Sequence, residues 1–216
     1  MLFRSFQQQF NITSGLVQLN TTWCYGLGSG AEIGLNVIGL NVNTANFEPF
    51  FLANSNVMQP PTYPFYTVNA QKAFQLSTGL KWTVGAQSGV SVGLHFGGYF
   101  YSNLVHTIPG WRTKLLCGLY GGTDSFLGPE DRSTLLPGYG SLGFQLGIEQ
   151  PVFGEKIFLV AENISGGHSL GESTVGAAWF FSRNWVLSVG YQFPNPQSKT
   201  LEACVLELTF VPATAH

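Results

Sequence analysis

Charged residues are scarce in this chain. Asp, Glu, Lys and Arg together make up 9% of its 216 residues, whereas they make up about 25% of an ordinary soluble protein. The formal net charge of −2 provides no excess of basic residues to neutralise phosphates, so nucleic acid is excluded as an expected partner. A water-exposed surface with so few charges would be poorly soluble, which argues against an ordinary soluble domain.

Long apolar runs and paired cysteines are also missing. No stretch of about 20 apolar residues occurs, and this excludes a helical membrane span. The three cysteines, Cys24, Cys117 and Cys204, are odd in number, so they cannot all pair within one chain, and their spacing does not resemble a zinc site. We therefore expect the cysteines to serve as small apolar residues within strands, and we expect neither a metal nor another cofactor.

What the chain has in abundance is a strict alternation of apolar and polar residues. In segment 185–193, with the sequence WVLSVGYQF, every second residue is large and apolar, and the residues between them are mostly small or polar. Side chains of a strand point alternately to opposite faces, so one face of this strand is apolar. Because the other face carries Gly, Ser and Gln rather than charges, it suits the interior of a barrel whose outside touches lipid.

The same pattern recurs along the chain and predicts an all-β fold with about ten strands. An open sheet would leave unpaired amides in hydrocarbon, so the prediction is a closed antiparallel transmembrane β-barrel, a single domain over residues 1–216, with eight or twelve strands as alternatives. One extra residue at Val37–Ile38 resets the alternation and predicts a β-bulge. The expected strands are 14–27, 31–43, 72–85, 90–101, 112–121, 142–149, 156–163, 173–181, 185–193 and 201–210.

These features make the chain similar to the bacterial outer-membrane β-barrel class. The resemblance rests on the alternating strands, the low charge and the last predicted strand, LEACVLELTF, which ends in the aromatic Phe210. It is architectural and indicates no narrower family. It implies a location in the bacterial outer membrane. The first residues, MLFRSFQQQ, lack the apolar core of a secretory signal, so we expect a signal peptide that has been removed from this sequence.

The polar faces of the predicted strands define a candidate interior. A barrel of about ten strands is close to the size that side chains fill, so a wide diffusion pore is not expected. Ion pairs across the interior would lock the barrel, whereas unpaired carboxylates would make a slightly cation-preferring pore. The predicted interior polar and ionisable residues are Glu32, Lys81, His95, Tyr99, Lys114, Gln145, Glu149, Glu162 and Glu207.

Residues 44–71 form the second unusual feature, a predicted long loop rich in aromatic residues and proline. A loop of this length is usually functional or disordered, and its aromatic content argues against disorder. It could fold into the barrel mouth as a constriction, dock on a partner through aromatic anchors, or cap the barrel end. The aromatic residues concerned are Phe47, Phe50, Phe51, Tyr63, Phe65 and Tyr66.

The function predicted from these patterns is that of an integral outer-membrane barrel, either a narrow pore or a structural component of an envelope complex. Membrane lipid is the expected partner, with an envelope protein or a second copy of the chain as further candidates. One alternative is a soluble barrel or sandwich that binds an apolar ligand. Another is a rim-site hydrolase or acyltransferase using His168 beside Glu172. Because no nucleophile-elbow or metal motif occurs, we do not expect an enzyme.

Overall fold

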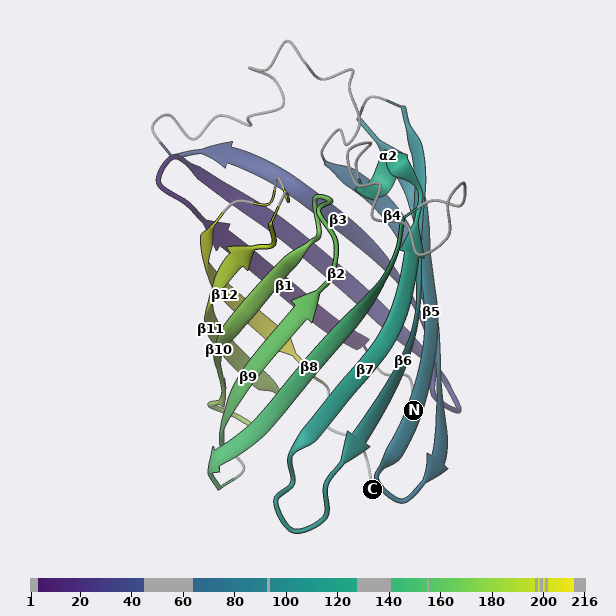
Figure 1. The fold of residues 1–216 in the computed structure, drawn as a ribbon, viewed down its shortest axis with the longest axis vertical. Helices are drawn as coiled ribbons and strands as arrows, with labels where there is room; N and C mark the ends of the chain where they lie inside the picture. Colours follow the sequence, from purple (N-terminus) through teal and green to yellow (C-terminus); the bar gives the residue numbers. More distant parts are fainter. Residues whose placement is uncertain are drawn as a thin grey trace.

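The computed structural model describes residues 4–44, 64–92, 94–127, 141–154, 156–196, 198, 200 and 202–211. Within these ranges, twelve antiparallel strands form one closed barrel, in which each strand pairs with its sequence neighbours and β1 pairs with β12 (Figure 1). No helix in this part of the chain is long and apolar enough to cross a membrane. The strands are β1 (Arg4–Ile12), β2 (Leu16–Gly28), β3 (Ala31–Asn43), β4 (Phe65–Ser77), β5 (Leu80–Ser91), β6 (Phe96–Thr107), β7 (Lys114–Gly122), β8 (Ser141–Phe153), β9 (Ile157–Ile164), β10 (Glu172–Phe180), β11 (Trp185–Pro194) and β12 (Ala203–Phe210), and the short helix α2 (Asp124–Leu127) follows β7.

The closed antiparallel barrel is confirmed, with twelve strands rather than ten. The strand predicted at 72–85 is in fact two strands, because β4 ends at Ser77 and β5 begins at Leu80. Apolar and polar residues continue to alternate across the two residues of the turn, so the sequence of the hairpin has the pattern of a single strand. Gly79 adopts a φ of +86°, which suits a tight hairpin turn. Residues 86–89, which lie between the expected strands 72–85 and 90–101, fall inside β5.

The other strand absent from the prediction is β1. Its three consecutive glutamines, Gln7, Gln8 and Gln9, hide the alternation because they place amides on both faces. Gln7 donates to Glu207 inside the barrel, whereas Gln8 accepts a hydrogen bond from Thr21 on the opposite face. The alternation therefore exists in the structure but is not visible as a change of polarity in the sequence.

Adding these two strands corrects the placement of the connections. The start of β1 and the end of β12 lie at one end of the barrel, here called the terminus end, and α2 lies at the other, here called the loop end (Figure 1). A ten-strand count would place the predicted loop 44–71 at the terminus end. With twelve strands, Asn43 and Phe65, the end of β3 and the start of β4, both lie at the loop end. The predicted loop is also too long, because Phe65 and Tyr66 belong to β4.

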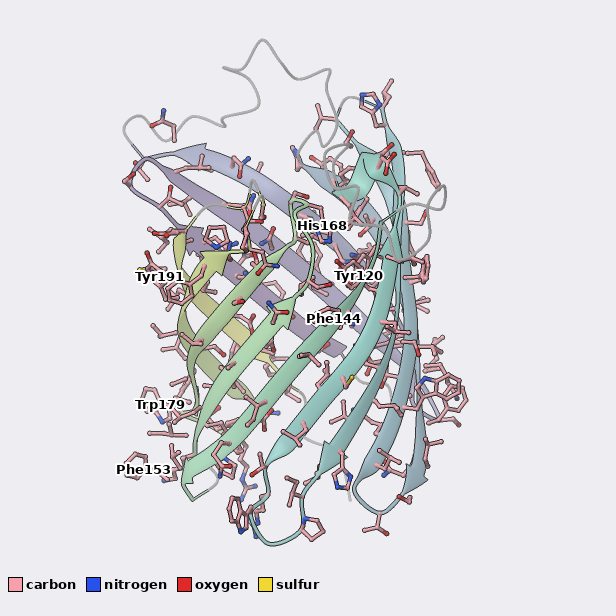
Figure 2. The ribbon with its side chains drawn as sticks, in the orientation of Figure 1. Tyr120, Phe144, Phe153, His168, Trp179 and Tyr191 are labelled. Atoms are coloured by element: carbon pink, nitrogen blue, oxygen red, sulfur yellow. The ribbon has the colours of Figure 1, made fainter. Side chains whose placement is uncertain are left out.

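The two faces of the wall divide as the alternation predicts. Large apolar side chains point outward and are exposed, among them Leu119 at 62%, Val68 at 59% and Val189 at 54%. Tyr191, Trp179 and Phe153 lie along the outside of the barrel (Figure 2). An exposed apolar band of this kind suits hydrocarbon and not water. A soluble barrel with an apolar interior, one of the alternatives above, would require the opposite arrangement.

The predicted bulge in β3 is present. Thr21 pairs with Val37 while Leu19 pairs with Leu40, so β3 carries one extra residue at this point. Gly39 has a φ of +75°, and its amide donates to the Asn20 Oδ1 at 2.7 Å. The predicted phase was wrong for one residue, because Ile38 packs inside the barrel and not on the outer face.

Arginine substitutions at neighbouring positions test this facing. Val189→Arg places a charge at the middle of the outer face of β11 and should destabilise the membrane-inserted barrel by about 2–4 kcal/mol. Ser188→Arg, one residue away, points into an interior cavity and should change stability far less. Urea unfolding in liposomes, followed by the heat-induced shift in electrophoretic mobility, measures both. An equal or reversed effect would contradict the assigned faces.

Candidate functional site

A cluster of large side chains narrows the barrel interior at the loop end. It consists of Phe65 on β4, Tyr99 on β6, Tyr120 on β7, and Phe126 and Leu127 on α2, each no more than 8% exposed. Phe126 meets the Phe65 ring edge-on at 5.3 Å, and Tyr99 stacks on Tyr120 at 5.5 Å between ring centres. We call this cluster the aromatic constriction. It blocks one side of the interior with packed apolar groups.

Inward-facing glycines make room for α2. A Cβ atom at Gly97 would lie 2.9 Å from the Phe65 Cζ and 3.1 Å from the Phe126 Cβ, and one at Gly122 would lie 2.8 Å from the Leu127 Cδ1. A side chain at either position would force Phe65, Phe126 or Leu127 to shift, so glycine in the walls formed by β6 and β7 lets these groups pack closely. The glycines are therefore part of the constriction.

The β9–β10 connection holds the constriction in place. The amide and hydroxyl of Ser169 both donate to the Leu127 carbonyl at 2.9 Å. The buried His168 accepts at Nδ1 from the Leu170 amide at 3.1 Å and contacts the Tyr120 hydroxyl through Nε2. That hydroxyl donates to the Ser165 carbonyl, so it accepts from His168, which is consistent with a neutral imidazole carrying its proton on Nε2. Tyr120 and His168 face each other inside the barrel (Figure 2).

This arrangement bears on the alternative of a rim-site hydrolase. The described contacts place the His168 Nε2 against Tyr120, and the hydroxyl of Ser169 is directed at the Leu127 carbonyl. The Ser165 hydroxyl accepts from the Phe144 amide at 2.8 Å. None of these contacts forms the serine–histidine pair that nucleophilic catalysis requires. Within the described residues, no group of three His, Cys, Asp or Glu side chains could hold a metal ion.

Beside the constriction lies an open cavity of about 310 Å³, which we call the amide cavity. It occupies the side of the barrel formed by β1–β3 and β10–β12, with the β9–β10 connection between it and the constriction. Glu172 is the ionisable residue of its described lining. The amide side chains of the lining are Gln9, Asn11, Gln18, Asn20, Asn41 and Gln192.

Two further cavities continue the interior toward the terminus end. They measure about 300 and 330 Å³ and share Glu149, Val160 and Glu162 in their linings. On β10, Glu172 lines the amide cavity, and Thr174, the next inward residue, lines the second cavity. The same step of two residues, from Gln192 to Gly190 on β11 and from Ala203 to Val205 on β12, joins these cavities. The three spaces therefore form a polar path along one side of the barrel.

The carboxylates that line this path differ in their partners. Glu149 pairs with Lys114 at 2.6 Å, and Glu207 accepts from Gln7 at 2.7 Å and Thr209 at 2.9 Å. The described residues offer no hydrogen-bond partner to the carboxylates of Glu162 and Glu172. The β8–β12 side is thus an acidic wall.

A separate polar network fills the β3–β6 side. Glu32 accepts from Gln71 at 2.6 Å, and the Tyr101 hydroxyl donates to Gln71 at 2.6 Å. Next to it, Asn36 donates to Gln87 at 2.7 Å and to Thr67 at 3.1 Å. These groups satisfy one another, so side-chain hydrogen bonds hold this side of the interior together.

The sequence-predicted site residues are distributed as follows. His95 is a correction, because it lies in the turn between β5 and β6, where its carbonyl accepts from the Ser91 amide, and not on an inward strand face. Phe65 lies in the aromatic constriction, whereas Tyr66 is 51% exposed on the outer face. Phe47, Phe50, Phe51 and Tyr63 fall outside the described residues. The structure places the remaining residues on the interior: Glu32, Lys81, Tyr99, Lys114, Gln145, Glu149, Glu162 and Glu207.

Sequence reasoning overlooked α2 and the amides of β1. Gly97 lies within the strand expected over residues 90–101, and an inward glycine is a signal that the interior holds something bulky beside it. The sequence does not reveal which segment provides the bulky group. Phe126 lies beside Gly97 and Leu127 beside Gly122 because the chain folds back at α2.

No protein-family model and no curated protein sequence matches the chain. Among solved structures, it is similar to the KdgM porin in complex with disordered oligogalacturonate, with a TM-score of 0.65, 8% identity, and coverage of 95% of this chain and 98% of that one. It is also similar to the NanC porin, with a TM-score of 0.60, 8% identity, and coverage of 97% and 100%. An outer-membrane channel from Pseudomonas putida F1 gives a TM-score of 0.55, 11% identity, and coverage of 97% and 94%. The chain therefore has the fold of outer-membrane channel barrels.

Truncating the two apolar residues of α2 tests the constriction. Phe126→Ala combined with Leu127→Ala removes side chains that are 3% and 0% exposed and should raise single-channel conductance, because both groups fill the interior. Leu119→Ala, on the exposed outer face of β7, is the matched control and should leave conductance unchanged. Planar-bilayer recording compares the three proteins. Identical conductance in all of them would mean that α2 does not limit the path.

Removal of one hydroxyl tests how the β9–β10 connection is held. Tyr120→Phe deletes the donor to Ser165 and leaves the buried His168 without this partner, so it should cost about 1–3 kcal/mol of stability. Tyr66→Phe, at an exposed outer position, should have little effect. Thermal unfolding in detergent, followed by tryptophan fluorescence, gives the difference, and a Tyr120→Phe protein as stable as Tyr66→Phe would refute the role of this contact.

Proposed function

We propose that the chain is an integral outer-membrane barrel that acts as a narrow pore for small hydrophilic solutes and prefers cations to anions. The observation that carries the proposal is the polar path of three cavities beside the aromatic constriction. A path lined by side chains in a barrel of this size restricts passage to small solutes. The likeness to outer-membrane channel structures supports the same location and general function.

The preference for cations follows from the balance of inward charges. Among the described strand residues, five inward carboxylates, Glu32, Glu149, Glu162, Glu172 and Glu207, face two inward lysines, Lys81 and Lys114. Because Lys114 is paired with Glu149, it contributes little net positive potential. Rings or walls of carboxylates favour cation passage. A bound oligogalacturonate, as in the KdgM complex, is a polyanion, and this acidic path does not favour such a solute.

A second candidate function is that of a closed structural barrel within an envelope assembly. The observation that favours it is the satisfied network of Glu32, Gln71 and Tyr101 together with the buried constriction, since both fill interior space. An envelope protein or a second copy of the chain would then be its partner. Conductance separates the two candidates, because a closed barrel should insert into a bilayer without passing ions.

The measurement for the pore is the reversal potential across a planar bilayer in a KCl gradient. For the wild-type protein, the sign of the reversal potential should indicate that potassium passes more readily than chloride. Glu162→Gln should reduce the selectivity, because this carboxylate borders two of the cavities and accepts no described hydrogen bond. Ser188→Ala, which lines one of the same cavities, is the uncharged control and should preserve it. Chloride selectivity in the wild type would overturn the charge argument, and absence of conductance from folded, inserted protein would favour the structural role.

A further inference from the structure

Amide side chains form a ladder across three strands in the wall of the amide cavity. Asn11 on β1 pairs in register with Gln18 on β2, which pairs with Asn41 on β3. On the next inward rung, Gln9 pairs with Asn20. Strand register therefore fixes five amides on one wall of a single cavity.

Hydrogen bonds orient this ladder. Gln9 Nε2 donates to Asn11 Oδ1 at 2.7 Å, Asn11 Nδ2 donates to Gln18 Oε1 at 3.3 Å, and Asn20 Oδ1 accepts from the bulge amide of Gly39. Within the described part of the chain, this leaves the Gln18 and Asn20 amide groups as donors and the Gln9 oxygen as an acceptor. The Asn41 Oδ1 is buried and accepts no hydrogen bond there. Donors and acceptors thus alternate along the wall, and a buried acceptor without a partner gains from a ligand that donates to it.

The facing wall completes a site without positive charge. It presents the carboxylate of Glu172, the hydroxyl-bearing residue Thr200 and the aliphatic side chain of Leu170. No lysine or arginine occurs among the described lining residues, so an acidic ligand would find no counter-charge. Ile38, placed inside by the bulge, adds a second aliphatic surface.

We propose that the amide cavity binds neutral, hydroxyl-rich solutes of saccharide size as they pass through the barrel. A hydroxyl group donates one hydrogen bond and accepts others, and amides offer both capacities at each residue. The aliphatic surfaces of Leu170 and Ile38 fit the C–H face of a sugar ring, and the volume of about 310 Å³ lies at the lower end of small-molecule sites. This inference rests on the proposed function and names one solute class for the same path.

The test uses glucose and glucuronate, which differ by one carboxylate on the same ring size. Single-channel recordings in KCl measure the current noise that each sugar induces, and the noise gives its association constant. Glucose should bind reversibly, and glucuronate should bind at least about fivefold more weakly because Glu172 and the rest of the acidic wall repel it. Equal binding of the two sugars would overturn the assignment to neutral solutes.

Variants locate the binding in the ladder. Gln18→Leu and Asn41→Leu should each lower the glucose association constant about fivefold, the loss expected for one net hydrogen bond. Gln75→Leu is the matched control, because Gln75 lies near the β4–β5 turn at the terminus end and bonds the carbonyls of Ser77 and Leu80. If Gln18→Leu fails to show the heat-induced mobility shift of a folded barrel, Gln18→Met replaces it, since it keeps a similar length and removes the amide donor.

The outcomes separate this inference from the proposed function. A folded barrel that inserts without conducting contradicts the pore itself. A barrel that conducts and selects cations, but whose glucose noise is absent or unchanged in Gln18→Leu and Asn41→Leu, overturns the saccharide site and leaves the pore intact. Glucose binding that Gln75→Leu weakens as strongly as the ladder variants would also overturn it, because the binding would then lie elsewhere in the barrel.

Discussion

Closure of the barrel is the constraint on which the rest of the structure depends. Backbone amides in hydrocarbon have no water to bond, so a spanning sheet must have no free edge. The pairing of β1 with β12, from Phe6 opposite Phe210 to Ile12 opposite Cys204, supplies that closure. Once the sheet is closed, the alternation of side chains sends every second residue inward, and the polar residues that a soluble protein would expose become the lining of a path.

The two sides of the interior differ in whether their polar side chains form hydrogen bonds with one another. On the β3–β6 side, Asn36, Gln71 and Tyr101 bond one another or their neighbours, so that side needs no water. On the β8–β12 side, Glu162 and Glu172 have no such partners in the described residues, and both border interior cavities. At the loop end, the aromatic constriction lies beside the amide cavity. The described cavities therefore lie along one side of the barrel.

Local sequence periodicity was sufficient to predict which strand faces point outward, but not where each strand begins and ends. The faces of β8 and β11 follow directly from their alternation. The β4–β5 hairpin was hidden because its turn preserves the period of two, and β1 was hidden because glutamine occupies both faces. His95 was misplaced for a related reason: the alternation runs through the β5–β6 turn, so polarity alone does not reveal that the chain has left the strand.

The sequence by itself determined a closed antiparallel barrel with apolar residues outside and a weakly charged polar interior, because strand periodicity and composition are local properties. Only the tertiary structure decided that α2 fills the space above Gly97 and Gly122, that Lys114 pairs with Glu149, and that Asn11, Gln18 and Asn41 share one wall. These relations depend on strand number and register, which bring together residues far apart in the chain. A shift of one residue in register would turn each of them to the other face.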